Sequence, residues 1–243
     1  MPAAETSGGV GLYGGTFNPL HIGHLRAAEE VMEALGLARM VFVPSARPPH
    51  KRAEQHDPIA PAADRLSWVE AAVASNPRFS VDPLELDREG PSYLVDTLES
   101  FAGRLAGERL VFALGCDAFQ EMGSWREPER LLTQADFAVT TRPPLRRGSL
   151  RDWLPEGLTA ALDIAEDGLS AVHREADTRI RLIEITSLDV SASSVRQRIR
   201  EGRSVRYLLP ETIHDEIVSS AIYADANTEA NTEAKAEANG AKK

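Results

Sequence analysis

The sequence contains a single cysteine, Cys116, among its 243 residues. One cysteine cannot form a disulfide within the chain, which excludes a disulfide-stabilised domain and fits a reducing compartment. The first residues, MPAAETSGG, lack the basic and apolar regions of a secretory signal. No segment approaches the roughly 18 consecutive apolar residues of a membrane span. Together these absences predict a cytoplasmic protein.

Positive charge is also scarce, since 27 Lys and Arg residues stand against 37 Asp and Glu residues, for a formal net charge of -10. Such a chain is not expected to bind nucleic acid, because a phosphate backbone requires a basic surface. A small phosphorylated ligand is still possible, because it responds to local charge only. Apolar residues make up 42% of the chain and charged residues 26%, which is typical of a globular domain.

Apolar runs and amphipathic helical patterns alternate along most of the chain. This alternation predicts an α/β fold, a Rossmann-like doubly wound parallel sheet in a single nucleotidyltransferase domain over residues 10–223. Residues 1–9 are interpreted as a flexible leader and residues 145–178 as a candidate insertion. Residues 224–243 are of low complexity and contain no large apolar residue after Ala224, so they are predicted to form a disordered tail.

The first motif is GGTFNPLHIGH, residues 14–24, where a predicted strand ends and a helix begins. Gly14 and Gly15 would let a phosphate chain approach the backbone, and Thr16 offers a hydroxyl donor. Asn18 is expected to cap a helix that starts near Pro19, whose N-terminus favours an anion. His21 and His24 would share one face of that helix and donate to phosphate oxygens.

Within the same helix, Gly23 costs roughly 1 kcal/mol relative to alanine, so we expect a ligand to press against the helix there. The simpler alternative for the whole motif is a tight strand-to-helix turn with two surface histidines. A second motif, VSASSVR at residues 190–196, resembles it in kind. Ser191 caps another helix, Ser193 adds a hydroxyl, and Arg196 supplies a forked cation for an anion. The alternative here is an ordinary capped helix with an exposed arginine.

Three other interpretations of these residues are less favoured. The glycines at 9, 11 and 14 match a dinucleotide fingerprint, but they flank the beginning of the strand, and Glu33 lies inside the first helix. No P-loop string occurs in the chain. A zinc site at His21 and His24 would need further ligands, and the spacing of His50 and His56 is not diagnostic.

Residues 14–24 resemble the signature of adenylyltransferases with an HxGH element, and residues 190–196 resemble the ISSTxxR element of the same group. Class I aminoacyl-tRNA synthetases share HxGH, but they need a lysine-rich second signature and a longer chain. Over residues 10–222 the chain is similar to bacterial nicotinate-nucleotide adenylyltransferases. Shared features are PPHK at 48–51, PSY at 91–93, GCD at 115–117, Trp125, and Arg142-Pro143. One departure is Ser45-Ala46, where relatives often carry Asn.

The resemblance implies roles for individual residues. Catalysis would depend on His21, His24 and Arg196. The ATP-binding set would be Gly14, Gly15, Thr16, Phe17, His24, His50, Lys51, Ser191, Ser193 and Arg196. The mononucleotide-binding set would be Tyr93, Thr97, Asp117, Trp125 and Arg142. Trp125 stands in a polar stretch, between Ser124 and Arg126, which also favours a ring-stacking role over a place in the core.

The implied reaction moves AMP from ATP to nicotinate mononucleotide and gives deamido-NAD and pyrophosphate. Mg²⁺ would be bound mainly through the ATP phosphates, without a dedicated carboxylate cage. The alternatives are a related adenylyltransferase that uses nicotinamide mononucleotide or pantetheine phosphate, and a non-catalytic nucleotide sensor. A homo-oligomer is possible, and the sequence does not decide between nicotinate and nicotinamide.

Overall fold

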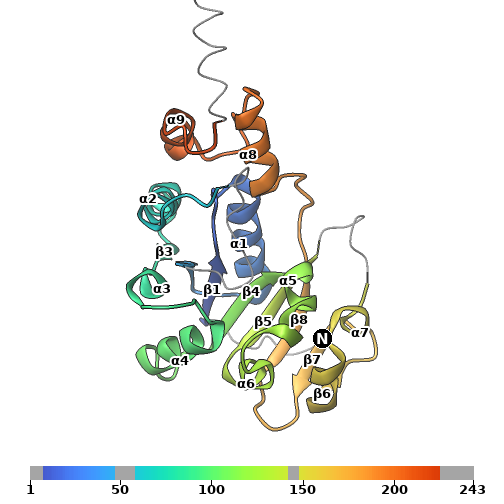
Figure 1. Cartoon of the computed structure of the whole chain (residues 1–243). Coiled ribbons are helices and arrows are strands. Elements are labelled where there is room, and N and C mark those ends of the chain that lie inside the picture. The colour runs from blue at the N-terminus through green and yellow to red at the C-terminus, as the bar shows by residue number, and fades with distance from the viewer. Residues whose placement is uncertain (1–7, 47–57, 142–147, 225–243) are drawn as a thin grey trace, which may run out of the picture.

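The computed structural model describes residues 8–46, 58–141 and 148–224. Its centre is one eight-stranded sheet in the order β3-β2-β1-β4-β5-β8-β7-β6 (Figure 1). The strands are β1 (Val10–Gly15), β2 (Arg39–Pro44), β3 (Phe79–Val81), β4 (Leu110–Gly115), β5 (Asp136–Thr141), β6 (Leu162–Ile164), β7 (Ser170–His173) and β8 (Arg179–Glu184). The first six positions in this order pair in parallel. Their succession is that of a doubly wound Rossmann-like sheet, which confirms the predicted fold class.

Helices cover both faces of this sheet. One hydrophobic core packs under α1 (Ile22–Leu35), α2 (Ala62–Val73), α8 (Ala192–Arg200) and α9 (Glu211–Ser219). The other packs under α4 (Leu94–Arg104), α5 (Cys116–Gln120), α6 (Pro128–Gln134) and α7 (Leu150–Trp153). Three short helices, α3 (Leu84–Asp87), η1 (Met122–Ser124) and η2 (Glu156–Ala161), lie in the connections.

Strand β4 shows why the central strands are continuous apolar runs. Leu110, Phe112 and Leu114 belong to the core beneath α4–α7, whereas Val111 and Ala113 belong to the core beneath α1 and α2. Successive side chains of a strand point to opposite faces, so a sheet covered on both sides must be apolar at every position.

The candidate insertion covers residues 145–178, of which the structure describes 148–178. These residues extend the same sheet. Strands β7 and β6 pair antiparallel to β8 and to each other, beyond the parallel strands. They lie at the opposite end of the molecule from α8 and α9 (Figure 1). The sequence did not predict these two strands, because β6 has three residues and β7 has four, which is too short for a clear alternation of apolar and polar residues.

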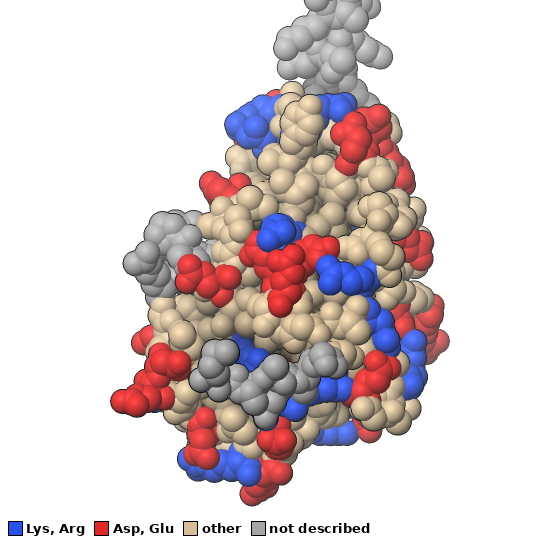
Figure 2. All heavy atoms as spheres, turned by 180° about the vertical axis from the view of Figure 1, so that it is seen from behind, with Lys and Arg blue, Asp and Glu red and all other residues tan. Residues whose placement is uncertain are grey.

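Charges on the back of the molecule are interspersed, with acidic and basic side chains side by side (Figure 2). The ion pair Arg78–Glu29 (2.8 Å) connects the segment before β3 to α1, whereas Arg26–Glu30 joins successive turns of α1 itself. Across the residues that the structure describes, no helix is both long and apolar enough to span a bilayer.

The topology fixes where a ligand can bind. From β1 the chain continues to β2 on one side, whereas β4 is followed by β5 on the other side. In open α/β sheets a crevice forms at such a switch point, outside the carboxyl ends of the strands.

Candidate active site

A cleft of about 750 Å³ opens at this switch point. Gly15 at the end of β1, Gly115 at the end of β4 and Thr140 near the end of β5 lie in its wall, as does Ile185 just after β8. The volume falls within the range of sites for nucleotide-sized ligands. The cleft therefore lies where the fold predicts a ligand and has room for one.

Helix α1 enters this cleft with His21 as its N-cap, and the helix begins at Ile22. The prediction that Asn18 caps a helix starting near Pro19 is therefore wrong. The Asn18 side chain has other partners: its Nδ2 donates to Pro58 O (3.0 Å), and its Oδ1 accepts from Ala60 N (2.9 Å). With its amide used to hold residues 58–60, Asn18 cannot cap the helix.

His21 and His24 both line the cleft and stack on one another, with ring centroids 3.7 Å apart and planes inclined by 27°. The backbone N–H of His21 donates to His24 Nδ1 at 3.1 Å. Because Nδ1 accepts a hydrogen bond, the neutral His24 ring carries its proton on Nε2. That nitrogen is then a donor suited to an anionic oxygen.

The glycines of the first motif make room for protein side chains. A Cβ on Gly23 would approach Val190 Cγ1 to 2.9 Å and His21 Nδ1 to 3.1 Å. The expectation that a ligand explains Gly23 is thus replaced by close packing between α1, His21 and Val190. Similarly, a Cβ on Gly15 would meet the Phe17 ring at 3.0 Å, and one on Gly14 would meet Phe112 at 3.0 Å. Gly15 lines the cleft, whereas Gly14 does not.

The second motif meets the first across the cleft. Ser191 caps α8 through a hydrogen bond from Ser194 N to its Oγ (3.1 Å), and Ser191 and Ser193 line the cleft. Arg196 also lines it, is buried, and donates from Nη1 to Asn18 O at 2.6 Å. The two helix beginnings therefore share one cavity, and a direct hydrogen bond joins α8 to the loop that precedes α1.

Among the other ATP-site candidates, Thr16 and Phe17 line the cleft. Asp117, from the mononucleotide set, lies in the same wall on the first turn of α5. His50, Lys51 and Arg142 fall outside the described residues.

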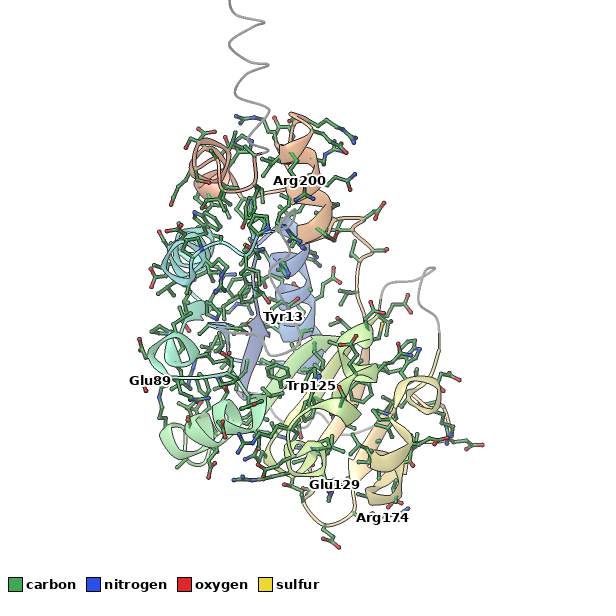
Figure 3. The ribbon with its side chains drawn as sticks, viewed as in Figure 1. Tyr13, Glu89, Trp125, Glu129, Arg174 and Arg200 are labelled. Atoms are coloured by element: carbon green, nitrogen blue, oxygen red, sulfur yellow. The ribbon has the colours of Figure 1, made fainter. Side chains whose placement is uncertain are left out.

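Tyr93, Thr97 and Trp125 are not among the residues that line the cleft. Tyr93 and Trp125 are half-buried against the core under α4–α7, and the Arg126 guanidinium lies 4.8 Å from the Tyr93 ring centroid. Figure 3 shows Trp125 near α5 and α6, below Tyr13, which is a cleft residue. Thr97 is 1% exposed and donates from Oγ1 to Glu85 Oε1 at 2.8 Å, so its hydroxyl already serves a buried partner.

Glu85 is a buried carboxyl group that the sequence did not single out. Burial raises its pKa, and hydrogen bonds from Thr97, Ser92 and Ser45 partly oppose this shift. Ser45 follows β2, Ser92 precedes α4 and Thr97 lies in α4, so Glu85 joins two loops to this helix.

Several cleft residues escaped the sequence analysis. Tyr13, Ile59, Thr186 and Leu188 contribute to the wall. Thr186 lies two residues after the end of β8, at the sheet edge where ligands bind in this type of fold. Ile59 carried no such signal, because it reaches the cleft through the hydrogen bonds that Asn18 makes with its neighbours.

The cleft is chemically suited to phosphate. His21, His24 and Arg196 supply nitrogen donors, and the beginnings of α1 and α8 add backbone N–H groups and positive dipole ends. Of the described residues in its wall, only Asp117 carries a carboxylate. A polyanion can therefore enter without facing several like charges.

Comparison with known proteins agrees with this chemistry. The model of the cytidylyltransferase-like family matches residues 12–198. A protein of Rubrobacter xylanophilus named "probable nicotinate-nucleotide adenylyltransferase" is 40% identical over 218 residues, which are 89% of this chain and 93% of that protein. A Thermus thermophilus protein of the same name is 37% identical over 216 residues, covering 88% of this chain and 98% of the relative.

Among solved structures, nicotinic acid mononucleotide adenylyltransferase of Plasmodium falciparum, complexed with NaAD, superposes with a TM-score of 0.67. The match covers 90% of this chain and 98% of that one, at 16% identity, so it supports the fold. The family match, the curated relatives and the paired motifs agree: the chain belongs to the nicotinate-nucleotide adenylyltransferases of the cytidylyltransferase-like family.

Proposed function

We propose that this enzyme transfers the adenylyl group of ATP to the phosphate of nicotinate mononucleotide, forming deamido-NAD and pyrophosphate. The observation that carries the proposal is the convergence of His24 and Arg196 on one cleft, at the beginnings of two helices. The curated relatives that cover nearly the whole domain carry the name of this activity.

In the proposed mechanism, a phosphate oxygen of the mononucleotide attacks the α-phosphorus of ATP in line. A bond forms between that oxygen and phosphorus, the bond to the bridging oxygen breaks, and pyrophosphate leaves. The attacking oxygen is already anionic, so the protein need not supply a nucleophile. Its contribution is positioning and stabilisation of charge on the transferring group.

Different residues of the cleft would bind the transferring phosphoryl group and the outer phosphates. His24 donates from Nε2 to the transferring phosphoryl group, because its Nδ1 is held by the His21 N–H. His21 and the hydroxyls of Ser191 and Ser193 add donors from the same wall. Arg196 binds the outer phosphates while its Nη1 stays on Asn18 O, so its fork is oriented before ATP arrives.

Mg²⁺ would enter with the nucleotide, held mainly through the ATP phosphates, and would supply positive charge to the triphosphate. The donors in the cleft wall are nitrogen and hydroxyl groups suited to phosphate, and Asp117 is the carboxylate on hand for a direct or water-mediated contact. Because the donors of the cleft wall suit phosphate, the cleft fits a metal that is delivered with ATP.

The acceptor side of the proposal rests on Tyr93, Thr97, Asp117, Trp125 and Arg142. Of these, Asp117 lies in the described cleft, and Tyr93 and Trp125 lie on the neighbouring α4–α6 side. In this proposal the pyridine ring extends from the cleft toward Tyr93 and Trp125. The leader at 1–9, the tail at 224–243, a homo-oligomer and a cytoplasmic location remain predictions.

The test is product detection with ATP, Mg²⁺ and each acceptor in turn: nicotinate mononucleotide, nicotinamide mononucleotide and pantetheine phosphate. We expect deamido-NAD and stoichiometric pyrophosphate, with the highest kcat/KM for nicotinate mononucleotide. Pyrophosphate release with another acceptor alone would reassign the substrate. Nucleotide binding without any pyrophosphate would indicate a sensor.

A further inference from the structure

Arg65 is a buried cation on the inner face of α2. It lies on the same helical stripe as Trp68, Val69 and Ala72, and only 1% of its surface is exposed. Burying a guanidinium is unfavourable unless its N–H donors are satisfied by hydrogen bonds. Its partners therefore show what the buried charge does.

All three guanidinium nitrogens of Arg65 donate to backbone carbonyls. Nε donates to Ala60 O (3.0 Å), Nη1 to Thr16 O (2.7 Å) and Nη2 to Ala46 O (3.4 Å). These carbonyls belong to the loops that follow β1 and β2 and to the segment that precedes α2. One side chain thus joins three loops at the carboxyl edge of the sheet.

The charge of Arg65 is not matched by an acid within the described residues, where no ion pair to it is found at 4.0 Å or less. Burial lowers the pKa of its guanidinium, and the nearby Tyr223 hydroxyl partly opposes the shift. Arginine nevertheless stays protonated in proteins. A fixed positive charge therefore lies directly behind Thr16, a residue of the cleft wall.

The Thr16–Asn18 loop, which accepts a hydrogen bond from Arg65, has an unusual backbone conformation. Phe17 has φ +46°, a left-handed value that is rare for a bulky side chain. The carbonyl before it, Thr16 O, accepts from Arg65, and the carbonyl after it, Asn18 O, accepts from Arg196. Two guanidinium groups thus bind the carbonyls of the residues immediately before and after the left-handed Phe17.

Holding Thr16 O has a consequence for the next N–H. In a trans peptide the C=O and the following N–H point in opposite directions. With Thr16 O directed into Arg65, the Phe17 N–H points away from α2, and Phe17 lies in the cleft wall. An N–H held in this way is a donor for an anionic oxygen.

We propose that Arg65 is a positioning residue for the triphosphate subsite, fixing the Thr16–Asn18 loop so that its backbone donors face ATP. This inference rests on the proposed function, because it assumes that the cleft binds the triphosphate of ATP. The distinguishing feature is geometry: three carbonyls in different directions require a planar fork, which lysine lacks.

The test compares Arg65→Met and Arg65→Lys with Arg109→Met. Arg109 pairs with Asp136 (Nη2 to Oδ1, 2.9 Å) near the beginnings of β4 and β5, the edge of the sheet opposite the cleft. Dissociation constants for a non-hydrolysable ATP analogue with Mg²⁺, and separately for nicotinate mononucleotide, are measured by calorimetry. Tm is recorded for every variant as the measure of a purely structural loss.

We expect Arg65→Met and Arg65→Lys to weaken binding of the ATP analogue at least about tenfold, and that of the mononucleotide about twofold or less. Arg109→Met should lower Tm and leave both affinities unchanged. ATP affinity within about twofold of the parent for either Arg65 variant would overturn the inference. If Arg65→Met fails to fold, Arg65→Lys decides alone.

These outcomes also separate the inference from the proposed function. A parent enzyme that binds the ATP analogue but transfers nothing to nicotinate mononucleotide contradicts the proposed function and leaves the Arg65 comparison valid. A parent that does not bind the analogue at all overturns both.

Discussion

Replacing His24 by alanine tests the part of the mechanism that geometry defines best. The substitution removes the Nε2 donor, the Nδ1 acceptor for the His21 N–H, and the ring that stacks on His21. The first loss acts on the reaction and the other two act on the beginning of α1. The loss of the donor lowers kcat, whereas the other two losses lower Tm, so the two effects can be measured separately.

Losing one donor to the charge of a transition state costs about 10²–10³ in kcat, or about 2.7–4 kcal/mol. Losing the capping interaction at a helix start costs about 1 kcal/mol of stability. The cleft admits water, which can replace Nδ1 as an acceptor for His21 N–H, so a larger penalty is not expected. A domain with a free energy of unfolding of about 5–15 kcal/mol stays folded.

The assay is pyrophosphate release at saturating ATP and nicotinate mononucleotide, with Tm measured in parallel. His24→Asn is the matched control, because its side-chain oxygen can accept from the His21 N–H while Nε2 is absent. We expect both variants to lose kcat, and His24→Ala to lose more Tm than His24→Asn, which keeps an acceptor for the His21 N–H. Turnover of His24→Ala within about threefold of the parent would refute the donor role.

The remaining predictions concern three other side chains. Arg196→Lys keeps the charge but loses the fork that contacts Asn18 O, so KM for ATP should rise about 10–100-fold; an unchanged KM would contradict its role. Trp125→Ala should weaken mononucleotide binding far more than ATP binding, and equal losses by calorimetry would count against stacking. Burial raises the pKa of Glu85 above the ordinary 4.5, so its contribution to stability is complete below that value and is lost as pH rises through the raised pKa. Glu85→Gln should therefore lose less Tm than the parent between pH 4.5 and pH 8, whereas parallel Tm curves would show that Glu85 does not titrate there.

The central sheet was predictable because its strands are covered on both faces. A segment such as Leu110–Leu114 must be apolar at every position and is recognised from composition alone. The strands Leu162–Ile164 and Ser170–His173 were missed because they are short and partly exposed, so local sequence carries little of their pattern.

The meeting of the two motifs was also predictable, since helix beginnings that follow parallel strands gather at one sheet edge. Contacts between residues far apart in the sequence were not. Asn18 looked like a helix cap, but its side chain bonds to Pro58 and Ala60, and no local rule reports such partners. Arg65 did leave a signal, because an arginine on the stripe of Trp68 and Val69 is out of place in an apolar face.

The account depends most on one triphosphate lying between the beginnings of α1 and α8. A crystal structure with Mg²⁺ and a non-hydrolysable ATP analogue tests this directly. We predict phosphate oxygens within hydrogen-bond distance of both His24 Nε2 and the Arg196 guanidinium. A triphosphate bound elsewhere, or one that contacts neither side chain, would contradict the account.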